Sequence, residues 1–340
     1  MKEFRHGGDV YTREIELDFS ASINPLGLPE GVKRVLTEQT DCFTRYPDPH
    51  CRALRKTIAV QEHCEPEDIL CGNGAADLID RAVRVIRPKR AVIAVPTFTE
   101  YERTLRAAGS EVVPYALREE TDFSLDEGIL ACIDGADMVC LCSPNNPVGN
   151  LVDEKLLRRI VRRCEECGAV LLLDECFLGF VKDAPPLHSP NVLVLRAFTK
   201  LYAMAGLRLG YTICADRDLL RRMASCGAWW SVSVPAQLAG EAALKETAYV
   251  AETRRLIAAQ REMLREALSR FGWKVYPSQA NYLLFRCPMP LDEMLLRENM
   301  AIRRCDDFTG LDKHFFRVAV RTERENAALL AAIGRCMTLG

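Results

Sequence analysis

The sequence predicts an α/β protein with a large domain built on a mainly parallel sheet and a smaller α+β domain. Between about residues 68 and 214, short apolar runs alternate with amphipathic segments. The apolar runs lack a polar face, which is typical of strands that helices cover on both sides. The chain has 340 residues and is therefore longer than one compact core usually supports.

Nearly continuous apolar runs predict the strands of the large sheet. Amphipathic stretches separate several of them. Gly74 to Arg87 places apolar side chains at helical spacing, and Asp153 to Glu166 presents one apolar face. The predicted strands are Asp68–Cys71, Ala91–Val95, Met138–Cys142, Val170–Leu173, Val192–Leu195 and Leu209–Cys214.

The pattern changes after about residue 235. We expect residues 31–235 to form the large domain, and residues 236–340 together with 1–30 to form the small one. The predicted elements of the second part are a long helix at 249–271, a strand at 281–285, a helix at 292–298, a strand at 316–320 and a last helix from residue 323.

Composition and charge argue against several classes of protein, among them nucleic-acid-binding, secreted and membrane proteins. The formal net charge is −2 and no long basic run occurs, which argues against a nucleic-acid partner. Neither a signal peptide nor a membrane span is expected. Fifteen cysteines follow no framework spacing, and Cys164-x-x-Cys167 has no second pair or histidine nearby, so no metal site is predicted. We expect a cytoplasmic protein with buried thiols.

Two polar segments follow predicted strands, where ligands collect in open α/β sheets. Cys71-Gly72-Asn73-Gly74-Ala75-Ala76-Asp77 opens a helix and can bind an anion through its free N–H groups. A dinucleotide fingerprint is disfavoured because Asp77 replaces its third glycine. Ser143-Pro144-Asn145-Asn146-Pro147 follows another strand and, alone, also fits a simple turn.

Two charged residues occupy unusual places. Asp174 directly follows an apolar strand, so its carboxylate requires a cationic partner or forms a structural ion pair. Lys200 lies among apolar residues, with Gly206 and Arg208 shortly after it. A lysine desolvated in such a place loses its proton and can attack a carbonyl group.

The two polar segments and the two segments around Asp174 and Lys200, in this order along the chain, resemble those of the pyridoxal 5′-phosphate (PLP) enzymes of fold type I. These enzymes are the class I and II aminotransferases with the aspartate-aminotransferase fold, and the resemblance covers nearly the whole chain. The resemblance implies that Lys200 forms the internal Schiff base with PLP. Asp174 would keep the pyridine nitrogen protonated, Asn146 would donate to the phenolic oxygen, and Phe98 would stack on the ring.

The same resemblance implies a phosphate site and a homodimer. Arg208 would pair with the cofactor phosphate, and Tyr46 resembles a tyrosine that reaches the phosphate of a neighbouring subunit. Two positions depart from the common pattern, since Phe177 and Ala197 replace residues that often carry hydroxyl groups. The other residues expected around the phosphate are Gly74, Ala75, Ala76 and Thr199.

For the substrate, the resemblance assigns Arg317 to an α-carboxylate, which suits a guanidinium with two parallel N–H groups. His6-Gly7-Gly8 and the stretch through Asn24 resemble the threonine-phosphate decarboxylases of cobalamin synthesis, lyases that release carbon dioxide. Arg321 also fits that group better. The expected substrate residues are His6, Asn24, Arg317 and Arg321, and the expected substrate is a phosphorylated amino acid.

Two alternatives stay open. Histidinol-phosphate aminotransferases, which are transferases, are closely related and use the same cofactor residues. Which bond breaks depends on whether the substrate carboxylate lies in or stands upright from the cofactor plane, and small differences in positioning decide this. A PLP-binding protein without catalysis is the second alternative, against which the complete set of Lys200, Asp174, Asn146 and Arg208 argues.

Overall fold

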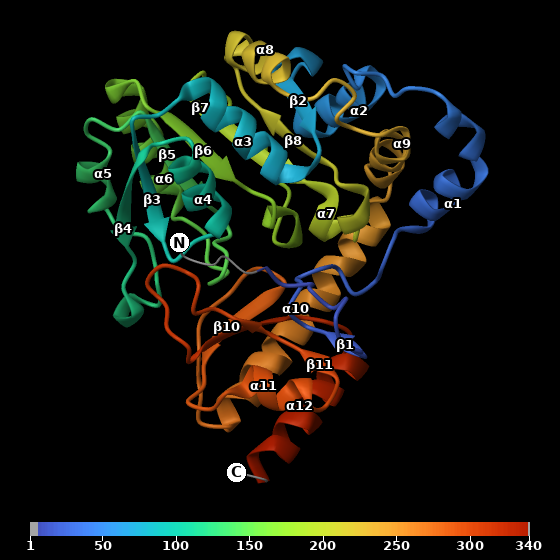
Figure 1. Cartoon of the computed structure of the whole chain (residues 1–340), viewed down its shortest axis with the longest axis vertical. Helices are drawn as coiled ribbons and strands as arrows, with labels where there is room; N and C mark the ends of the chain where they lie inside the picture. The colour runs from blue at the N-terminus through green and yellow to red at the C-terminus, as the bar shows by residue number, and fades with distance from the viewer. Residues whose placement is uncertain (1–5, 339–340) are drawn as a thin grey trace.

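The computed structural model describes residues 6–338 and has the predicted α/β architecture. The large domain occupies the upper part of Figure 1 and the small domain the lower part, with helix α10 (Thr247–Arg270) running from one to the other. Residues 1–5, considered above for a signal peptide, lie outside the described residues. No helix formed by residues 6–338 is long and apolar enough to cross a membrane.

The large domain is built on one seven-stranded sheet with the order β2-β8-β7-β6-β5-β3-β4. It is mainly parallel, as predicted, because only β8 runs antiparallel to its neighbours. The strands are β2 (Ile69–Gly72), β3 (Arg90–Val95), β4 (Glu111–Ala116), β5 (Met138–Cys142), β6 (Val170–Asp174), β7 (Val192–Ala197) and β8 (Gly210–Ile213).

Helices cover both faces of this sheet, which explains its apolar strands. Leu171 and Leu173 of β6 pack into one core cluster, and Leu172 between them packs into another. The first face carries α2 (Arg52–Glu62), α6 (Glu154–Cys167) and α9 (Val234–Ala243). The second carries α3 (Gly74–Ile86), α4 (Thr99–Ala107) and α8 (Arg217–Cys226).

Edge strand β4 was not predicted. Its residues are alternately exposed and covered, and Pro114 interrupts the apolar pattern, as edge strands tolerate. The helices that complete the large domain are α1 (Glu30–Glu38), α5 (Ile129–Cys132) and α7 (Phe198–Leu201).

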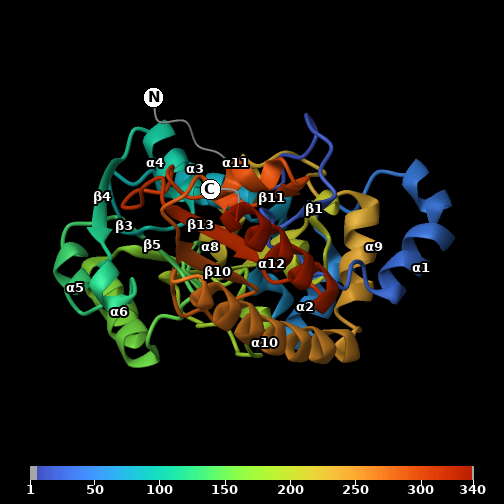
Figure 2. The same cartoon turned by 90° about the horizontal axis from the view of Figure 1, so that it is seen from below.

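The small domain packs α10, α11 (Leu291–Leu296) and α12 (Glu323–Thr338) around an antiparallel sheet, as Figure 2 shows from below. The strand order is β12 (Arg303–Arg304), β13 (Phe315–Ala319), β10 (Tyr282–Arg286) and β9 (Lys274–Val275). The N-terminal strand β1 (Leu17–Asp18) pairs in parallel with β11 (Met300–Ala301).

The expected boundary at residue 235 falls inside α9. The buried residues Ala236, Ala239 and Ala243 of this helix belong to the core of the large domain, and α9 packs against α1 and α2. We therefore propose that the second boundary lies in α10. The pairing of β1 with β11 supports the proposal that the N-terminal segment belongs to the small domain.

All fifteen cysteines are free thiols. Cys164 packs into the core under α6, and burial raises its pKa to about 12, whereas Cys167 is half-buried near Asp134. Among residues 6–338, no group of three or more His, Cys, Asp or Glu side chains is arranged to hold a metal ion.

Candidate active site

A cavity of about 420 Å³ brings most of the predicted site residues together. Its walls include the ends of β5, β6 and β7, the start of α3 and strands β12 and β13 of the small domain. A larger cavity of about 1040 Å³ shares Cys176 and Ala197 with it, but Lys200 does not line that one. The predicted residues in the smaller cavity are His6, Ala75, Ala76, Phe98, Asn146, Asp174, Thr199, Lys200, Arg208 and Arg317.

Lys200 lies in α7, which begins as soon as β7 ends at Ala197. Removal from water, and then the positive charge of Arg317, lower the pKa of the Lys200 ammonium to about 8. A substantial fraction of this amine is therefore neutral at physiological pH, in contrast to an exposed lysine. That is the property required of a nucleophile toward an aldehyde.

This shift predicts the pH dependence of cofactor uptake by the protein freed of PLP. Only the neutral amine of Lys200 can react, so the rate of PLP attachment should rise with pH and reach half of its maximum near pH 8. Rapid mixing with PLP, followed by visible absorbance, measures it. A midpoint near 10, as for an ordinary lysine, would contradict the prediction.

Asp174 ends β6 and is buried with both carboxylate oxygens engaged. The Tyr101 hydroxyl donates to Oδ2 at 2.5 Å, and the Cys176 amide donates to Oδ1 at 2.9 Å. Burial raises the pKa of Asp174, and the hydrogen bonds from Tyr101 and Cys176 oppose that rise. The site therefore holds a desolvated carboxyl group in one orientation, as a partner for a protonated ring nitrogen requires.

Tyr101 was not predicted as a site residue, although it lies three positions after Phe98. Replacing it by phenylalanine removes a hydrogen bond that favours the ionised form of Asp174, so the pKa of Asp174 should rise further. We expect a loss in kcat of at least ~10-fold, since hydrogen bonds to charged groups contribute about 1.5–3 kcal/mol. Steady-state kinetics with PLP at saturation measures it; kcat within twofold of wild type would contradict the role.

An anion site forms where α3 begins beside Arg208. The first-turn N–H groups of Ala75 and Ala76 have no partner within the helix and carry the positive end of its dipole. Gly74 has φ +78°, and a β-carbon there would lie 2.7 Å from Arg208 Nη2, so glycine lets the guanidinium approach the helix. Arg208 forms no ion pair with any carboxylate among the described residues.

Arg317 of β13 is buried and connects the two domains. One terminal nitrogen donates to Asn146 Oδ1 and the other to the Ser20 carbonyl oxygen at 3.0 Å. Its Nε is buried and has no hydrogen-bond partner in the described chain. Burial lowers the pKa of Arg317. A buried cation with an unused N–H is strongly suited to an anionic ligand.

Several residues that line the cavity were not predicted from the sequence, among them Arg303, Ser22 and Phe308. Arg303 stands opposite Arg317 across the β12–β13 ladder and pairs with Asp307 at 2.7 Å. Ser22 Oγ is buried without a hydrogen-bond partner in residues 6–338. Strand β12 has only two residues, so the sequence contains no periodic pattern from which the direction of the Arg303 side chain could be predicted.

Comparisons with known proteins agree with this geometry. The family model for aminotransferase class I and II matches residues 14–333. The chain belongs to this family. It is 39% identical to the threonine-phosphate decarboxylase of Salmonella typhimurium, covering 95% of this chain and 91% of the relative. It is 35% identical to the histidinol-phosphate aminotransferase of Methanosarcina mazei, covering 91% and 85%.

Solved structures of the same family share the fold. The histidinol-phosphate aminotransferase from Clostridium acetobutylicum superposes with a TM-score of 0.88 at 30% identity, covering 95% of this chain and 99% of that one. The L-threonine-O-3-phosphate decarboxylase from Porphyromonas gingivalis gives 0.84 at 26%, with the same coverage. The aspartate-aminotransferase-like fold predicted from the sequence is confirmed.

Class I and II aminotransferases use PLP, and the residues of the cavity fit this cofactor. Bound PLP supplies an electron sink. The anion site at Ala75, Ala76 and Arg208 suits its phosphate, and Lys200 and Asp174 suit its aldehyde and ring nitrogen. Asn146 Oδ1 accepts from Arg317, whereas its Nδ2 has no partner among the described residues and is available to donate. Phe98 forms part of the wall beside them.

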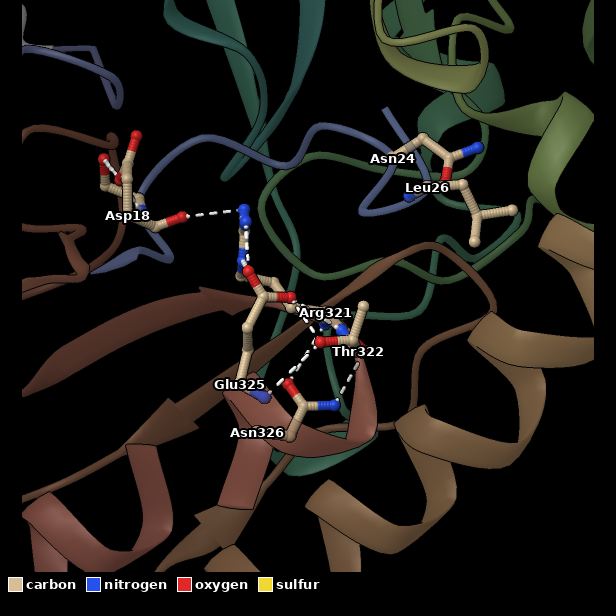
Figure 3. A network of polar contacts seen from close by, with 8 residues as sticks. Asp18, Asn24, Leu26, Arg321, Thr322, Glu325 and Asn326 are labelled. Atoms are coloured by element: carbon tan, nitrogen blue, oxygen red, sulfur yellow. Dashed lines mark hydrogen bonds and ion pairs between the residues drawn. The ribbon is translucent and has the colours of Figure 1, made fainter. Parts of the chain in front are cut away.

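Asn24 and Arg321 do not line the cavity of this aminotransferase-family site. Figure 3 shows both side chains with their polar contacts. Asn24 donates to the Leu201 carbonyl and the Thr253 hydroxyl, and accepts from the Leu26 amide. Its side chain is fully used in joining the N-terminal segment to the large domain. Asn24 has a structural role in this structure, and its contact with substrate stays a prediction.

Arg321 is occupied in the same way. It binds Glu325 through Nε and Nη2 and donates to the Asp18 carbonyl oxygen at 3.2 Å. Figure 3 shows this network, which ties β1 to the start of α12. Arg321 thus supports the segment that carries Ser20 and Ser22. Its contact with substrate stays a prediction, whereas Arg303 lines the cavity.

Tyr46 also lies outside the cavity. It is 79% exposed, and its ring stacks on that of Trp230 at 4.4 Å between centroids. A tyrosine that acts in a neighbouring subunit would stand apart from its own site in this manner, so its predicted role stays a prediction.

Proposed function

We propose that this chain is a PLP-dependent lyase that converts L-threonine O-3-phosphate to aminopropanol phosphate and carbon dioxide, in cobalamin synthesis. The observation that carries the proposal is the 39% identity over nearly the whole chain to a threonine-phosphate decarboxylase. A relative from Leptospira interrogans named as an adenosylcobalamin biosynthesis bifunctional protein, 31% identical over 93% of this chain, supports the pathway. Histidinol-phosphate aminotransferase is the alternative.

The charges of the cavity match such a substrate. With PLP bound, Arg208 and the start of α3 would be occupied by the cofactor phosphate. Arg317, Arg303 and His6 then line the part of the cavity that is left for substrate. A substrate with both a carboxylate and a phosphate carries two anionic groups, which the unused Nε–H of Arg317 and the side chains of Arg303 and His6 would bind.

The rigid support of Arg317 bears on which bond breaks. Its two terminal nitrogens are held by Asn146 and Ser20, so the orientation of the guanidinium is fixed. Its unpartnered Nε–H can therefore meet a ligand from one direction only. A carboxylate bound there has a fixed tilt relative to the wall that carries Phe98. An upright carboxylate leaves as carbon dioxide, because the breaking bond then overlaps the conjugated system. Lys200, which lines the same cavity, would donate the proton that replaces it.

The test is product analysis with PLP-loaded protein and L-threonine O-3-phosphate, with and without 2-oxoglutarate. Carbon dioxide and aminopropanol phosphate without any oxo-acid are expected. Glutamate formed only in the presence of 2-oxoglutarate would overturn the lyase assignment and make histidinol phosphate the next donor to test.

We further propose that the chain is a homodimer with shared active sites. Supporting this is an aromatic patch of Tyr46, Trp229 and Trp230, whose rings contact one another and are each at least 44% exposed, which is unusual for rings of this size. A second copy would cover the patch and bring Tyr46 to the partner's cofactor. The free thiols also support a reducing compartment, and we propose the cytoplasm.

The dimer gives a prediction for Trp230→Glu. A buried charge at the interface should shift the protein toward the monomer and lower PLP affinity at least ~10-fold, since Tyr46 would no longer reach the partner. Light scattering after size exclusion measures the mass. A wild-type protein that is monomeric at micromolar concentration would contradict the proposal.

A further inference from the structure

We propose that Glu100 is a positioning residue that holds the N-terminal arm, residues 6–8, across the cavity and thereby sets the affinity for phosphorylated substrates. The inference rests on the proposed function and deepens it. Glu100 is not one of the residues that the sequence analysis assigned to the site. Its contacts, its charge and the packing of the arm each support this role.

Glu100 occupies the second position of α4, two residues after Phe98, and lines the cavity. Its side chain is only 9% exposed. One carboxylate oxygen lies 3.0 Å from His6 Nε2, and Arg103 donates to both oxygens at 2.6–3.0 Å. In the described part of the chain, Glu100 is the one hydrogen-bond partner of the His6 imidazole.

The charge of Glu100 fixes which group donates. Burial opposes its ionisation, but the hydrogen bonds from His6 and Arg103 prevail and lower its pKa to about 2. At working pH the carboxylate can only accept, so His6 Nε2 carries the proton. The imidazole is thus held with a defined orientation beside Phe98, at 6.1 Å between ring centroids.

The other side of the arm is fixed to the small-domain network. The Gly8 amide donates to Ser20 Oγ at 2.8 Å, and a β-carbon at Gly7 would lie 2.1 Å from the Ser20 carbonyl oxygen. That carbonyl accepts from Arg317. The arm therefore joins α4 to the backbone that supports the buried arginine, and only glycine permits this close approach.

Loss of the Glu100 contact should affect substrate binding more than the chemical step. His6 is 53% exposed, so without Glu100 little would hold its imidazole over the cavity. A free arm would have to be ordered each time a substrate binds, and that entropy would weaken affinity. Residues that touch the reacting atoms, such as Lys200, keep their contacts. Loss of Glu100 should hence raise KM and leave kcat nearly unchanged.

A double-mutant cycle with holoenzyme tests this, using L-threonine O-3-phosphate and carbon dioxide release. Glu100→Gln and His6→Gln should each raise KM at least ~10-fold with kcat within about twofold, as expected for one lost hydrogen bond to a charged group. The double variant should be no worse than either single one. Glu100→Asp should recover part of the affinity. Additive effects in the cycle would overturn the proposal.

Glu102→Gln is the matched control. Glu102 lies on the same helix and is 13% exposed, but it does not line the cavity. It pairs with Arg106 at 2.9 Å and accepts from Thr309 Oγ1 at 2.9 Å. Its replacement should leave KM within about twofold of wild type. An increase equal to that of Glu100→Gln would show a general effect of α4 and would overturn a specific role for Glu100.

Hydrogen–deuterium exchange separates this inference from the proposed function. Glu100→Gln should speed exchange of the peptide that contains Gly8 and leave α6 unchanged, whatever reaction the enzyme performs. Unchanged exchange at Gly8 would overturn the anchoring role. A wild-type protein that releases no carbon dioxide would instead overturn the lyase assignment, and the same cycle would then be measured with histidinol phosphate and 2-oxoglutarate.

Discussion

Replacement of Lys200 by alanine should abolish both the visible absorbance of bound PLP and turnover. The Lys200 amine is the proposed nucleophile of the cavity, with its pKa lowered to about 8, and among residues 6–338 no other lysine lines that cavity. A methyl group can neither bind the aldehyde covalently nor carry a proton to or from the substrate. Loss of proton transfer alone costs a factor on the order of 10² to 10⁴, so a decrease in kcat above ~10³-fold is expected.

The measurement requires a check that the variant folds. Lys200→Ala removes a partly buried amine and no ion pair, since no carboxylate among the described residues bonds to it. Far-UV circular dichroism and the melting temperature should therefore remain close to wild type. Lys182→Ala, at a lysine that lines only the larger cavity, is the matched control and should retain absorbance and activity. Turnover that survives Lys200→Ala would refute the site.

The sequence predicted the fold correctly, and it placed most of the proposed cofactor residues in one cavity, because both depend on local signals. The strands of the large sheet are buried on both faces, so their apolar runs are nearly continuous. Residues such as Asp174 and Lys200 stand immediately after strands β6 and β7. Their position along the chain therefore fixes their position in space, at one edge of the sheet.

The substrate end was harder to predict because its residues come from irregular segments and from the small domain. Arg303 and Arg321 are both arginines near β13, yet only Arg303 faces the cavity. The β12–β13 register decides this for Arg303, and an ion pair with Glu325 turns Arg321 away. Likewise Asn24 and Ser22 are two residues apart, and only Ser22 lines the cavity. The direction in which each of these side chains points cannot be predicted from composition or from the periodicity of the sequence.

Relatives with two different reactions resemble this chain at similar levels of identity, 39% for a decarboxylase and 35% for an aminotransferase. Most of the residues expected to bind PLP follow strands of the large sheet, and they suit both reactions. We propose that reaction choice depends on the cavity residues that would direct the carboxylate and the phosphate, together with the contacts that hold them. These residues are Arg317, Arg303, Ser22 and His6. Differences among relatives at these positions should matter more than differences elsewhere.

Arg317→Gln should give the second-largest effect, because it removes a buried cation that is anchored on both sides. Truncating one partner of a buried, hydrogen-bonded charge pair costs about 2–5 kcal/mol, so kcat/KM should fall on the order of 10²-fold or more. Arg317→Lys keeps the charge but loses the fork of N–H groups. We expect it to remain at least ~10-fold below wild type.

A second readout tests whether the effect arises in the cavity. The charge of Arg317 lowers the pKa of Lys200 next after desolvation, so its removal should move the midpoint of PLP uptake to higher pH. Arg317→Lys should leave that midpoint near pH 8, since the positive charge is retained. If Arg317→Gln left both kcat/KM and this midpoint unchanged, Arg317 would neither bind the substrate carboxylate nor act on Lys200. A change in kcat/KM with an unchanged midpoint would confine its role to the substrate.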